Sequence, residues 1–262
     1  MYHGKPNWFE LSTARGALAD AEGFYGKVLG WAVVDGGMEG FTYHLASHDG
    51  EMIAGLMELL PQMEGIPPNW LIYFDVDDLD AAVAKIQTLG GKVHRDPAEI
   101  PGTGRFAIVA DPQGAVLGLL EPAPMDPQPP VESGAFNQRK ESHGNWIELM
   151  STDPAAGFDF YSELFGWTKS DAVDMGEMGT YQVFAWQGTQ IGGMMGLGMS
   201  PVSCWLPYFG VNGVTEAIER IKAAGGEILH GPVEVPGPAY IAFARDPQGA
   251  HFSVVGPKEH TE

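Results

Sequence analysis

Residues 7–13 read N-W-F-E-L-S-T, and this stretch decides the fold because residues 145–152 repeat it as N-W-I-E-L-M-S-T. A second motif follows each copy, as F-Y-G-K-V-L-G-W at residues 24–31 and F-Y-S-E-L-F-G-W at residues 160–167. The pentapeptide D-P-Q-G-A also occurs once in each half. The motifs keep their order, and the offset between copies falls only from 138 to 135 residues along the chain. Two copies of one module, which differ by small deletions in loops, account for this pattern.

The composition indicates a globular protein of two domains. The 262 residues divide at the repeat into halves of ordinary domain size, and 44% of the residues are hydrophobic. The formal net charge of -20 argues against nucleic acid or an acidic membrane as a partner, because both are polyanions. The single cysteine, Cys204, excludes an intramolecular disulfide, and neither a signal peptide nor a membrane span is apparent. We therefore expect a soluble, cytoplasmic monomer or homodimer whose partner is a small-molecule ligand.

Each half is predicted to hold two units of the order β-α-β-β-β. In the first unit, residues 8–11 alternate as a strand, and apolar residues recur at three- and four-residue steps over residues 18–29, as in an amphipathic helix. In the second unit, Asp77 or Asp78 can cap a helix that ends before Gly90. The other strands of this half are expected at residues 31–34, 41–46, 52–59, 70–76, 92–94, 105–110 and 115–120. The second half repeats this plan.

A proline-rich stretch separates the two halves. Residues 121–144 contain five prolines followed by polar and charged residues, which is typical of a partly extended linker. We therefore assign residues 1–121 to the first module, residues 122–142 to the linker and residues 143–262 to the second module. In the second module, one helix is expected to begin after Asp153 and another at Asn212.

Taken together, the motifs resemble those of the vicinal oxygen chelate superfamily, which includes glyoxalase I, bleomycin-resistance proteins and extradiol dioxygenases. The resemblance rests on F-Y-x-x-x-x-G-W after a first strand, on a helix that ends at Gly-Gly and on D-P-x-G before a last strand, and it covers nearly the whole chain. It implies an α+β fold in which two βαβββ units form a curved mixed sheet around a ligand cavity, with the helices outside. Two such cavities are then expected, either one per module or formed by units exchanged between modules.

The resemblance also implies a divalent metal held by His and Glu side chains, but the matching positions of this chain carry other residues. These positions are Trp8 and Trp146 on the first strands, Leu71 and Leu206 in the second units, and Gly118 and Ser253 on the last strands. Only Glu58 could match a Glu ligand. Because a divalent cation needs three or four converging donors, we predict that the usual metal site is lost. No cofactor is predicted, and a divalent metal stays open as an option for the fold but is not supported by these positions.

Two repeated carboxylates are the main candidates for ligand binding or catalysis. Glu10 and Glu148 each follow a tryptophan by two residues, on the strand face that is expected to turn inward. Burial would raise the pKa of such a carboxyl, which could then orient a ligand or act as a base. The alternative is a structural glutamate that is satisfied by backbone N–H groups or faces water in a wide cavity.

Aromatic and polar residues on the strands are further candidates. Four tryptophans open the predicted first strands of the units and could form the aromatic walls of a pocket: Trp8, Trp70, Trp146 and Trp205. The hydroxyls of Tyr73 and Tyr208 could donate hydrogen bonds to a ligand, although core packing is the alternative for all these rings. His251 shares a strand face with Ser253 and could pair with Glu148 for acid/base chemistry, or be a partly exposed strand histidine.

Two main functions remain open at this point. The first is metal-independent binding of a small, partly apolar molecule in a sheet-lined cavity. The alternative is a lyase or dioxygenase-like enzyme of the same superfamily, which would use either an atypical metal site or metal-free carboxylate chemistry. The residues available to that enzyme are Glu10, Glu58, Glu148 and His251. A third interpretation is a scaffold whose cavities are filled by side chains. The sequence therefore leaves open whether the protein is an enzyme.

Overall fold

The computed structural model describes residues 2–38, 40–124, 130 and 134–260. The first module holds β1 (Pro6–Thr13), α1 (Leu18–Leu29), β2 (Ala32–Asp35), β3 (His44–His48), β4 (Glu51–Glu58), β5 (Asn69–Asp75), α2 (Leu79–Thr88), β6 (Lys92–Ile100), β7 (Gly104–Ala110) and β8 (Val116–Pro122). The second module holds β9 (Gly144–Met150), α3 (Pro154–Phe165), β10 (Thr168–Asp174), β11 (Thr180–Trp186), β12 (Thr189–Met195), β13 (Cys204–Gly210), α4 (Val214–Ala223), β14 (Glu227–Val235), β15 (Ala239–Arg245) and β16 (His251–Gly256). Short 3-10 turns lie at Pro61–Met63 and Gly176–Met178.

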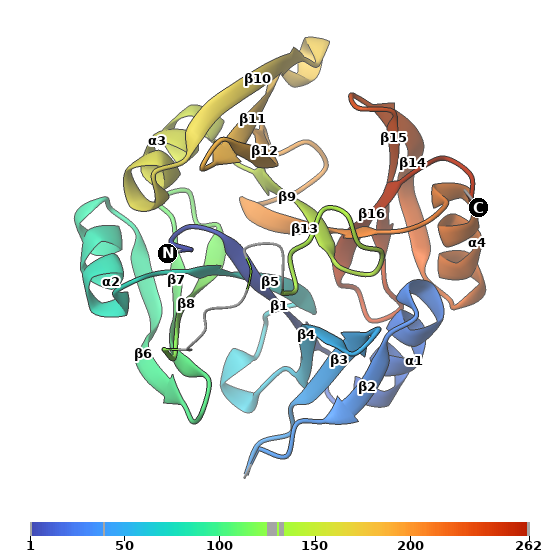
Figure 1. The fold of residues 1–262 in the computed structure, drawn as a ribbon, viewed down its shortest axis with the longest axis horizontal. Helices are drawn as coiled ribbons and strands as arrows, with labels where there is room; N and C mark the ends of the chain where they lie inside the picture. Colours follow the sequence, from blue (N-terminus) through green and yellow to red (C-terminus); the bar gives the residue numbers. More distant parts are fainter. Residues whose placement is uncertain (1, 39, 125–129, 131–133, 261–262) are drawn as a thin grey trace. The chain divides into compact units, whose positions relative to one another are not determined.

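The strands form two eight-stranded mixed sheets, one per module (Figure 1). Their orders are β2-β3-β4-β1-β5-β8-β7-β6 and β10-β11-β12-β9-β13-β16-β15-β14, so the second sheet repeats the connectivity of the first. In each module the first strand pairs in parallel with the fourth, as β1 with β4 and β9 with β12. This arrangement confirms the predicted α+β fold of two tandem modules built from four βαβββ units.

The chain packs into two compact bodies, and each body takes parts of both modules. Body 1 comprises Met1–Asn7, Ile72–Ser133 and Ile147–Leu206, and thus contains α2 and α3. Body 2 comprises Trp8–Leu71, Gly134–Trp146 and Pro207–Glu262, and thus contains α1 and α4. The middle of the predicted linker, residues 125–129 and 131–133, lies outside the described residues.

Most predicted elements form, with shifted ends. The strand expected at residues 41–46 begins only at His44, and a 2.8 Å hydrogen bond from Gly36 N to Tyr43 O lies just before the β2–β3 pairing. The strand expected at residues 92–94 continues to Ile100 by pairing with β7. The helix expected from Asn212 begins at Val214, with Gly213 rather than a side-chain cap before it.

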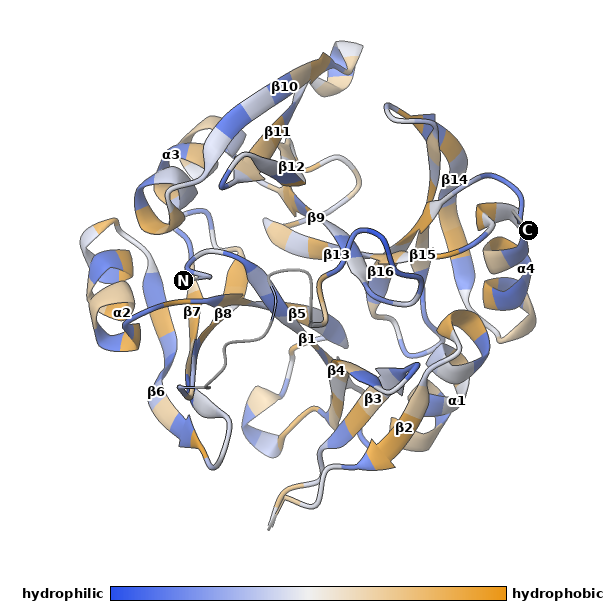
Figure 2. Ribbon diagram, viewed as in Figure 1, coloured by the Kyte–Doolittle hydropathy of each residue, from blue (hydrophilic) through white to orange (hydrophobic). Residues whose placement is uncertain are grey.

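The helix ends follow local chemistry. Asp78, rather than Asp77, caps α2 by accepting a 2.9 Å hydrogen bond from Ala81 N, and Asp153 does the same for α3 with Ala156 N. Both F-Y-x-x-x-x-G-W helices end at a glycine in the left-handed conformation. In Figure 2 each helix carries both hydrophilic and hydrophobic residues, as expected of a helix that packs on a sheet with one face.

The reversal at the motif glycine folds each motif tryptophan back onto the motif tyrosine. Tyr25 and Trp31 stack with ring centroids 5.5 Å apart in body 2, and Tyr161 and Trp167 stack at the same separation in body 1. All four rings are buried under the helices. Burial of each such ring stabilises the fold by about 1.5–3 kcal/mol. The motif rings therefore contribute to the core between the helices and the sheet, which we call the helix-side core.

Candidate functional site

The first strand of the first module presents different residues on its two faces. Phe9 and Leu11 are fully buried, and Phe9 packs edge-on against Phe209 in the helix-side core. Trp8 and Glu10 alternate with them and are partly exposed, so they lie on the opposite face. The predicted orientation of these two candidates is the one that strand alternation requires.

A chain of hydrogen bonds links Trp8 and Glu10 through a tyrosine that the sequence did not single out. Trp8 Nε1 donates to Tyr43 Oη at 2.9 Å, and Tyr43 Oη donates to Glu10 Oε2 at 2.9 Å. Burial and then the charge of Glu10 raise the pKa of Tyr43 far above its ordinary value. Tyr43 is therefore a neutral donor to the Glu10 carboxylate at any physiological pH.

Gly55 makes this contact sterically feasible. Glu10 and Gly55 are register partners on β1 and β4, and the Tyr43 side chain crosses the strand at this point. A Cβ at residue 55 would lie 1.8 Å from Tyr43 Oη, well inside contact distance. A glycine is therefore needed where the tyrosine reaches the carboxylate.

The second module repeats these residues at the same spacing. Glu148 and Gly193 are register partners on β9 and β12, and a Cβ on Gly193 would lie 2.2 Å from the ring of Tyr181. Glu148, however, is only 3% exposed. The thiol of Cys204 lies in its electrostatic neighbourhood, where burial and, to a lesser degree, the charge of Glu148 raise the thiol pKa.

The side chains of Trp70 and Trp205 do not lie on the strand face that corresponds to that of Trp8. Trp70 Nε1 donates to Tyr25 Oη at 2.9 Å, and Trp205 Nε1 donates to Tyr161 Oη at 3.0 Å. Both acceptors are buried helix residues, so these tryptophans lie in the helix-side cores. The prediction that they form walls of a sheet-lined cavity is therefore wrong, because they face the other side of their strands.

Each of these tyrosines continues to the aspartate of a D-P-Q-G turn. Tyr25 Oη donates to Asp246 Oδ2 at 3.0 Å, and Tyr161 Oη donates to Asp111 Oδ2 at 3.1 Å. The other oxygen of Asp246 accepts from three backbone N–H groups of its turn, including that of Ala250 at 2.9 Å. Burial raises the pKa of both aspartates. The motif residues thus form buried structural chains.

Asp75 is a further polar residue that sequence reasoning missed. It is 5% exposed, accepts a hydrogen bond from Asn7 Nδ2, and burial raises its pKa to about 7. Its signal in the sequence was a carboxylate at the end of the apolar strand N-W-L-I-Y-F-D. A shifted carboxyl of this kind is a candidate for function as well as for structure.

Comparison with known families identifies the fold. A family model described as the Glyoxalase/Bleomycin resistance protein/Dioxygenase superfamily matches residues 10–119 and 144–254. The chain belongs to this superfamily. The match falls on both modules, in agreement with the resemblance inferred from the motifs.

Two relatives of the superfamily are similar along nearly their whole length. One, from Mycobacterium tuberculosis, is named "Putative glyoxylase CFP32" and is 32% identical over 258 residues, which cover 97% of this chain and 95% of the relative. The other, from Streptomyces peucetius, is named "Anthracycline biosynthesis protein DnrV" and is 29% identical over 273 residues, which cover 98% of this chain and 94% of the relative.

Solved structures of the superfamily have the same fold at low sequence identity. The 2,3-dioxygenase LapB from Pseudomonas sp. KL28 aligns with a TM-score of 0.68 and 16% identity, covering 100% of this chain and 96% of its own. The Mn(II)-bound glyoxalase from Novosphingobium aromaticivorans aligns with a TM-score of 0.66 and 15% identity, covering 100% of this chain and 85% of its own. In the described part of this chain, no helix is long and apolar enough to span a membrane.

The residues of this chain do not fit the divalent metal that the superfamily implies. At Gly118, a Cβ would lie 2.1 Å from the ring of Tyr73, so an aromatic ring covers the position expected to carry a Glu ligand. Ser253, its counterpart, is fully buried and pairs with Tyr208 and Phe243 on the adjacent strands. Among the described residues, no three His, Cys, Asp or Glu side chains gather as metal ligands would.

The remaining predicted site residues are distributed over both bodies. His251 is exposed at the start of β16, opposite Arg245, and burial of part of the ring lowers its pKa. Glu148 belongs to body 1 and His251 to body 2, so their pairing stays a prediction. Tyr73 and Tyr208 are buried, and Tyr208 packs edge-on against Phe243.

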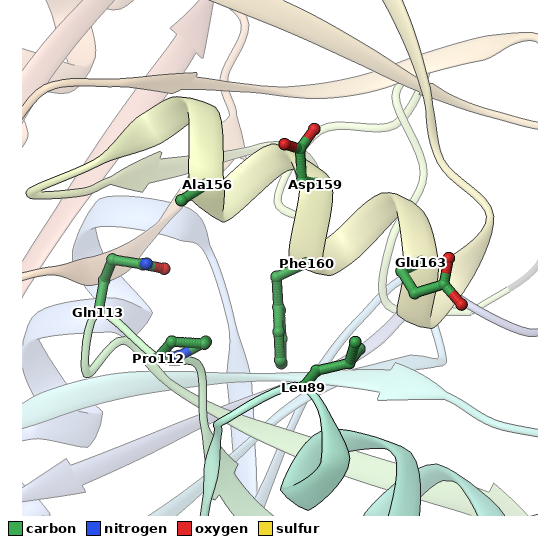
Figure 3. A pocket seen from close by; sticks show the side chains of 7 residues that line it. All are labelled: Leu89, Pro112, Gln113, Ala156, Asp159, Phe160 and Glu163. Carbon is green, nitrogen blue, oxygen red and sulfur yellow. The ribbon is translucent and has the colours of Figure 1, made fainter.

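A cavity of about 370 Å³ lies on the helical side of body 1 (Figure 3). It is lined by Leu89, Pro112, Gln113, Ala156, Asp159, Phe160 and Glu163. In Figure 3 the ring of Phe160 points between Pro112 and Leu89, while the carboxylates of Asp159 and Glu163 lie along the helix above it. None of the predicted site residues lines this cavity.

Proposed function

We propose that this protein binds a small, partly apolar molecule on the sheet faces opposite its helices, without the divalent metal that is usual in the superfamily. The observation that carries the proposal is the hydrogen-bond chain from Trp8 through Tyr43 to Glu10. It joins an indole ring to a partly exposed carboxylate that a neutral phenol orients. An aromatic surface beside one fixed polar group is a common design for a small-molecule site.

The ligand class follows from the chemistry of these groups. A carboxylate accepts hydrogen bonds, so the ligand carries a hydroxyl, amine or ammonium donor, and an indole favours a flat aromatic or polycyclic body. The name of the Streptomyces peucetius relative connects that protein with anthracycline biosynthesis. We therefore propose an aromatic natural product with polar substituents as the ligand. The proposed contacts are Trp8, Glu10, Tyr73, Trp146, Glu148, Tyr208, His251 and Ser253.

The absence of a metal requirement is supported by the donor chemistry. The positions that the superfamily implies as ligands carry Trp8, Leu71 and Gly118 in the first module, and none of these side chains binds a divalent cation. Glu58, the one matching carboxylate, pairs with Thr13 in the strand register. A single carboxylate does not supply the three or four donors that such an ion needs.

A lyase-like enzyme is the second candidate. It is favoured by the 32% identity to the relative named as a glyoxylase and by Glu10, a partly exposed carboxylate of the kind that acts as a general base. The two candidates differ in turnover. A binder forms a stoichiometric complex from which the intact molecule is recovered, whereas an enzyme converts it.

A screen of small aromatic molecules tests the proposed function. Purified protein would be stripped of metal with a chelator and screened by thermal shift and fluorescence against aromatic compounds that include an anthracycline. We expect a raised melting temperature with at least one compound that carries a hydrogen-bond donor, and its recovery unchanged by mass spectrometry. Failure of every compound to bind would contradict the proposal, and conversion of a bound compound would favour the enzyme.

We further propose that the protein acts in the cytoplasm, as a monomer or homodimer, and binds neither nucleic acid nor membranes. The net charge of -20 and the single Cys204, which is a free thiol, support this proposal. Cell fractionation and light scattering of the purified protein test it. Recovery in a membrane or extracellular fraction, or as a larger assembly, would contradict it.

A further inference from the structure

We propose that Tyr43 is a positioning residue for the Glu10 carboxylate and that the first module offers a ligand the more accessible of the two anchors of this kind. This inference rests on the proposed ligand-binding function and specifies which module performs it. Its starting point is the repetition of tryptophan, glutamate, tyrosine and glycine in both modules with one offset of 138 residues. The glutamates of the two sets differ in exposure, and the assignment to the first module rests on this difference.

The direction of the hydrogen bonds in the first module is fixed by the donor at its beginning. An indole nitrogen can only donate, so Tyr43 Oη must accept from Trp8 Nε1 and direct its own proton to Glu10 Oε2. This arrangement holds one carboxylate oxygen at a defined place. Because a carboxylate can accept about four hydrogen bonds, the bond from Tyr43 does not by itself prevent Glu10 from accepting one from a ligand.

The second module buries the corresponding carboxylate. Glu148 is 3% exposed, whereas Glu10 is partly exposed. The neighbouring strand also differs, since Cys204 stands where the first module has Asn69, and the thiol lies 3.3 Å from Ser200 Oγ. The Glu10 carboxyl is therefore more accessible to a ligand than that of Glu148. The structure assigns the polar anchor to the first module.

Matched variants in the two modules test this assignment. The probe is 9-aminoacridine, a flat fluorescent cation with hydrogen-bond donors, titrated into the metal-stripped full-length protein. Glu10→Gln is expected to weaken binding by roughly 10- to 100-fold, because it removes a charge-assisted hydrogen bond, and Tyr43→Phe by about 3- to 10-fold. Glu148→Gln and Tyr181→Phe make the matched changes in the second module and are expected to weaken binding less than their first-module counterparts. Tyr240→Phe, which removes an exposed hydroxyl outside the proposed contacts, is the control, with an affinity expected within about twofold of wild type.

Gly55→Ala separates positioning from simple loss of a polar group. The added methyl displaces the Tyr43 hydroxyl but removes no donor or acceptor, so its effect on probe binding should match that of Tyr43→Phe. In the double variant the two losses should not add, since both act through one hydroxyl. The anionic dye 8-anilinonaphthalene-1-sulfonate serves as a second probe, and its fluorescence should not rise in any of these variants, as it would if a damaged fold exposed apolar surface.

The titrations distinguish failure of the assignment to the first module from failure of the proposed function. The expected result is one bound probe molecule per chain, with binding weakened more by the first-module variants than by those of the second module. Two molecules per chain, or equal losses from the variants of the two modules, would overturn the assignment to the first module while leaving the proposed function intact. A wild-type protein that binds neither probe nor any aromatic compound would overturn the proposed function, and this inference with it.

Discussion

The hydroxyl of Tyr25 donates a 3.0 Å hydrogen bond to Oδ2 of Asp246, a residue 221 positions later in the chain. The equivalent bond from Tyr161 to Asp111 is 3.1 Å long. Each bond joins the F-Y-x-x-x-x-G-W motif of one module to the D-P-Q-G turn of the other, inside one compact body. These two motifs, F-Y-x-x-x-x-G-W and D-P-Q-G, therefore connect the two modules to each other and have a structural role.

Removal of either tyrosine hydroxyl should destabilise the body that contains it. Tyr25→Phe and Tyr161→Phe each leave a buried aspartate oxygen and an indole N–H without their partner, which costs about 1–3 kcal/mol. Urea unfolding followed by tryptophan fluorescence measures the loss. Tyr240→Phe, which removes an exposed hydroxyl, is the control and should have no measurable effect. Wild-type stability in both buried variants would show that these hydrogen-bond chains do not stabilise the bodies that contain them.

Asp75 predicts a stability that falls as the pH rises. Its folded-state pKa of about 7 lies above the ordinary aspartate pKa of 3.8, so between these values the folded protein binds more protons than the unfolded chain. The contribution of Asp75 is then fully present below about pH 4 and is lost as the pH rises through about 7, by at most about 4 kcal/mol. Melting temperatures from pH 5 to pH 9 should fall less steeply in Asp75→Asn, whose amide can still accept from Asn7. Parallel profiles would contradict the assignment.

Two glycine substitutions should have opposite effects on stability. Gly118→Ala places a methyl 2.1 Å from a ring carbon of Tyr73, and such overpacking costs about 1–3 kcal/mol. Gly23→Ala lies within α1 with no atom in its way, and it should stabilise the protein by about 0.5–1 kcal/mol. Differential scanning calorimetry distinguishes the two signs. A neutral Gly118→Ala would mean that the ring of Tyr73 does not cover this position in solution.

The reactivity of the Cys204 thiol should depend on the charge of Glu148. Because that charge helps to raise the thiol pKa, Glu148→Gln should increase the thiolate fraction and speed alkylation by iodoacetamide at pH 8. Glu10→Gln, the matched change in the first module, should leave the rate unchanged. An unaltered or slower rate in Glu148→Gln would show that the carboxylate and the thiol are not close in solution.

The sequence predicted the fold well because the fold depends on repeated periodic patterns. Strand alternation alone placed Glu10 on the face opposite Phe9, as found. The same rule explains the error at Trp70. This residue lies one position before the strand position that is equivalent to Trp8, so its side chain faces the helices. A shift of one residue in a strand reverses its face, and a tryptophan gives no sign of its face by itself.

Tyr43 could not be predicted because its role depends on residues distant in sequence. It precedes β3 at the end of a turn, and it reaches Glu10 only because residue 55 is glycine. Neither fact appears in the pattern around Tyr43. Asp75 was missed for a related reason, since its pKa depends on burial and on Asn7, 68 positions earlier.

Metal-free binding at Glu10 is the central claim, and one titration tests it most directly. The protein would be dialysed against a chelator, shown by mass spectrometry to hold no metal, and titrated with 9-aminoacridine before and after addition of Mn(II), Fe(II), Ni(II) or Zn(II). We predict one binding site per chain with the same affinity in every case, and an affinity lower by roughly 10- to 100-fold in Glu10→Gln. Binding that appears only after a metal is added, or a stoichiometric metal that survives the chelator, would contradict it.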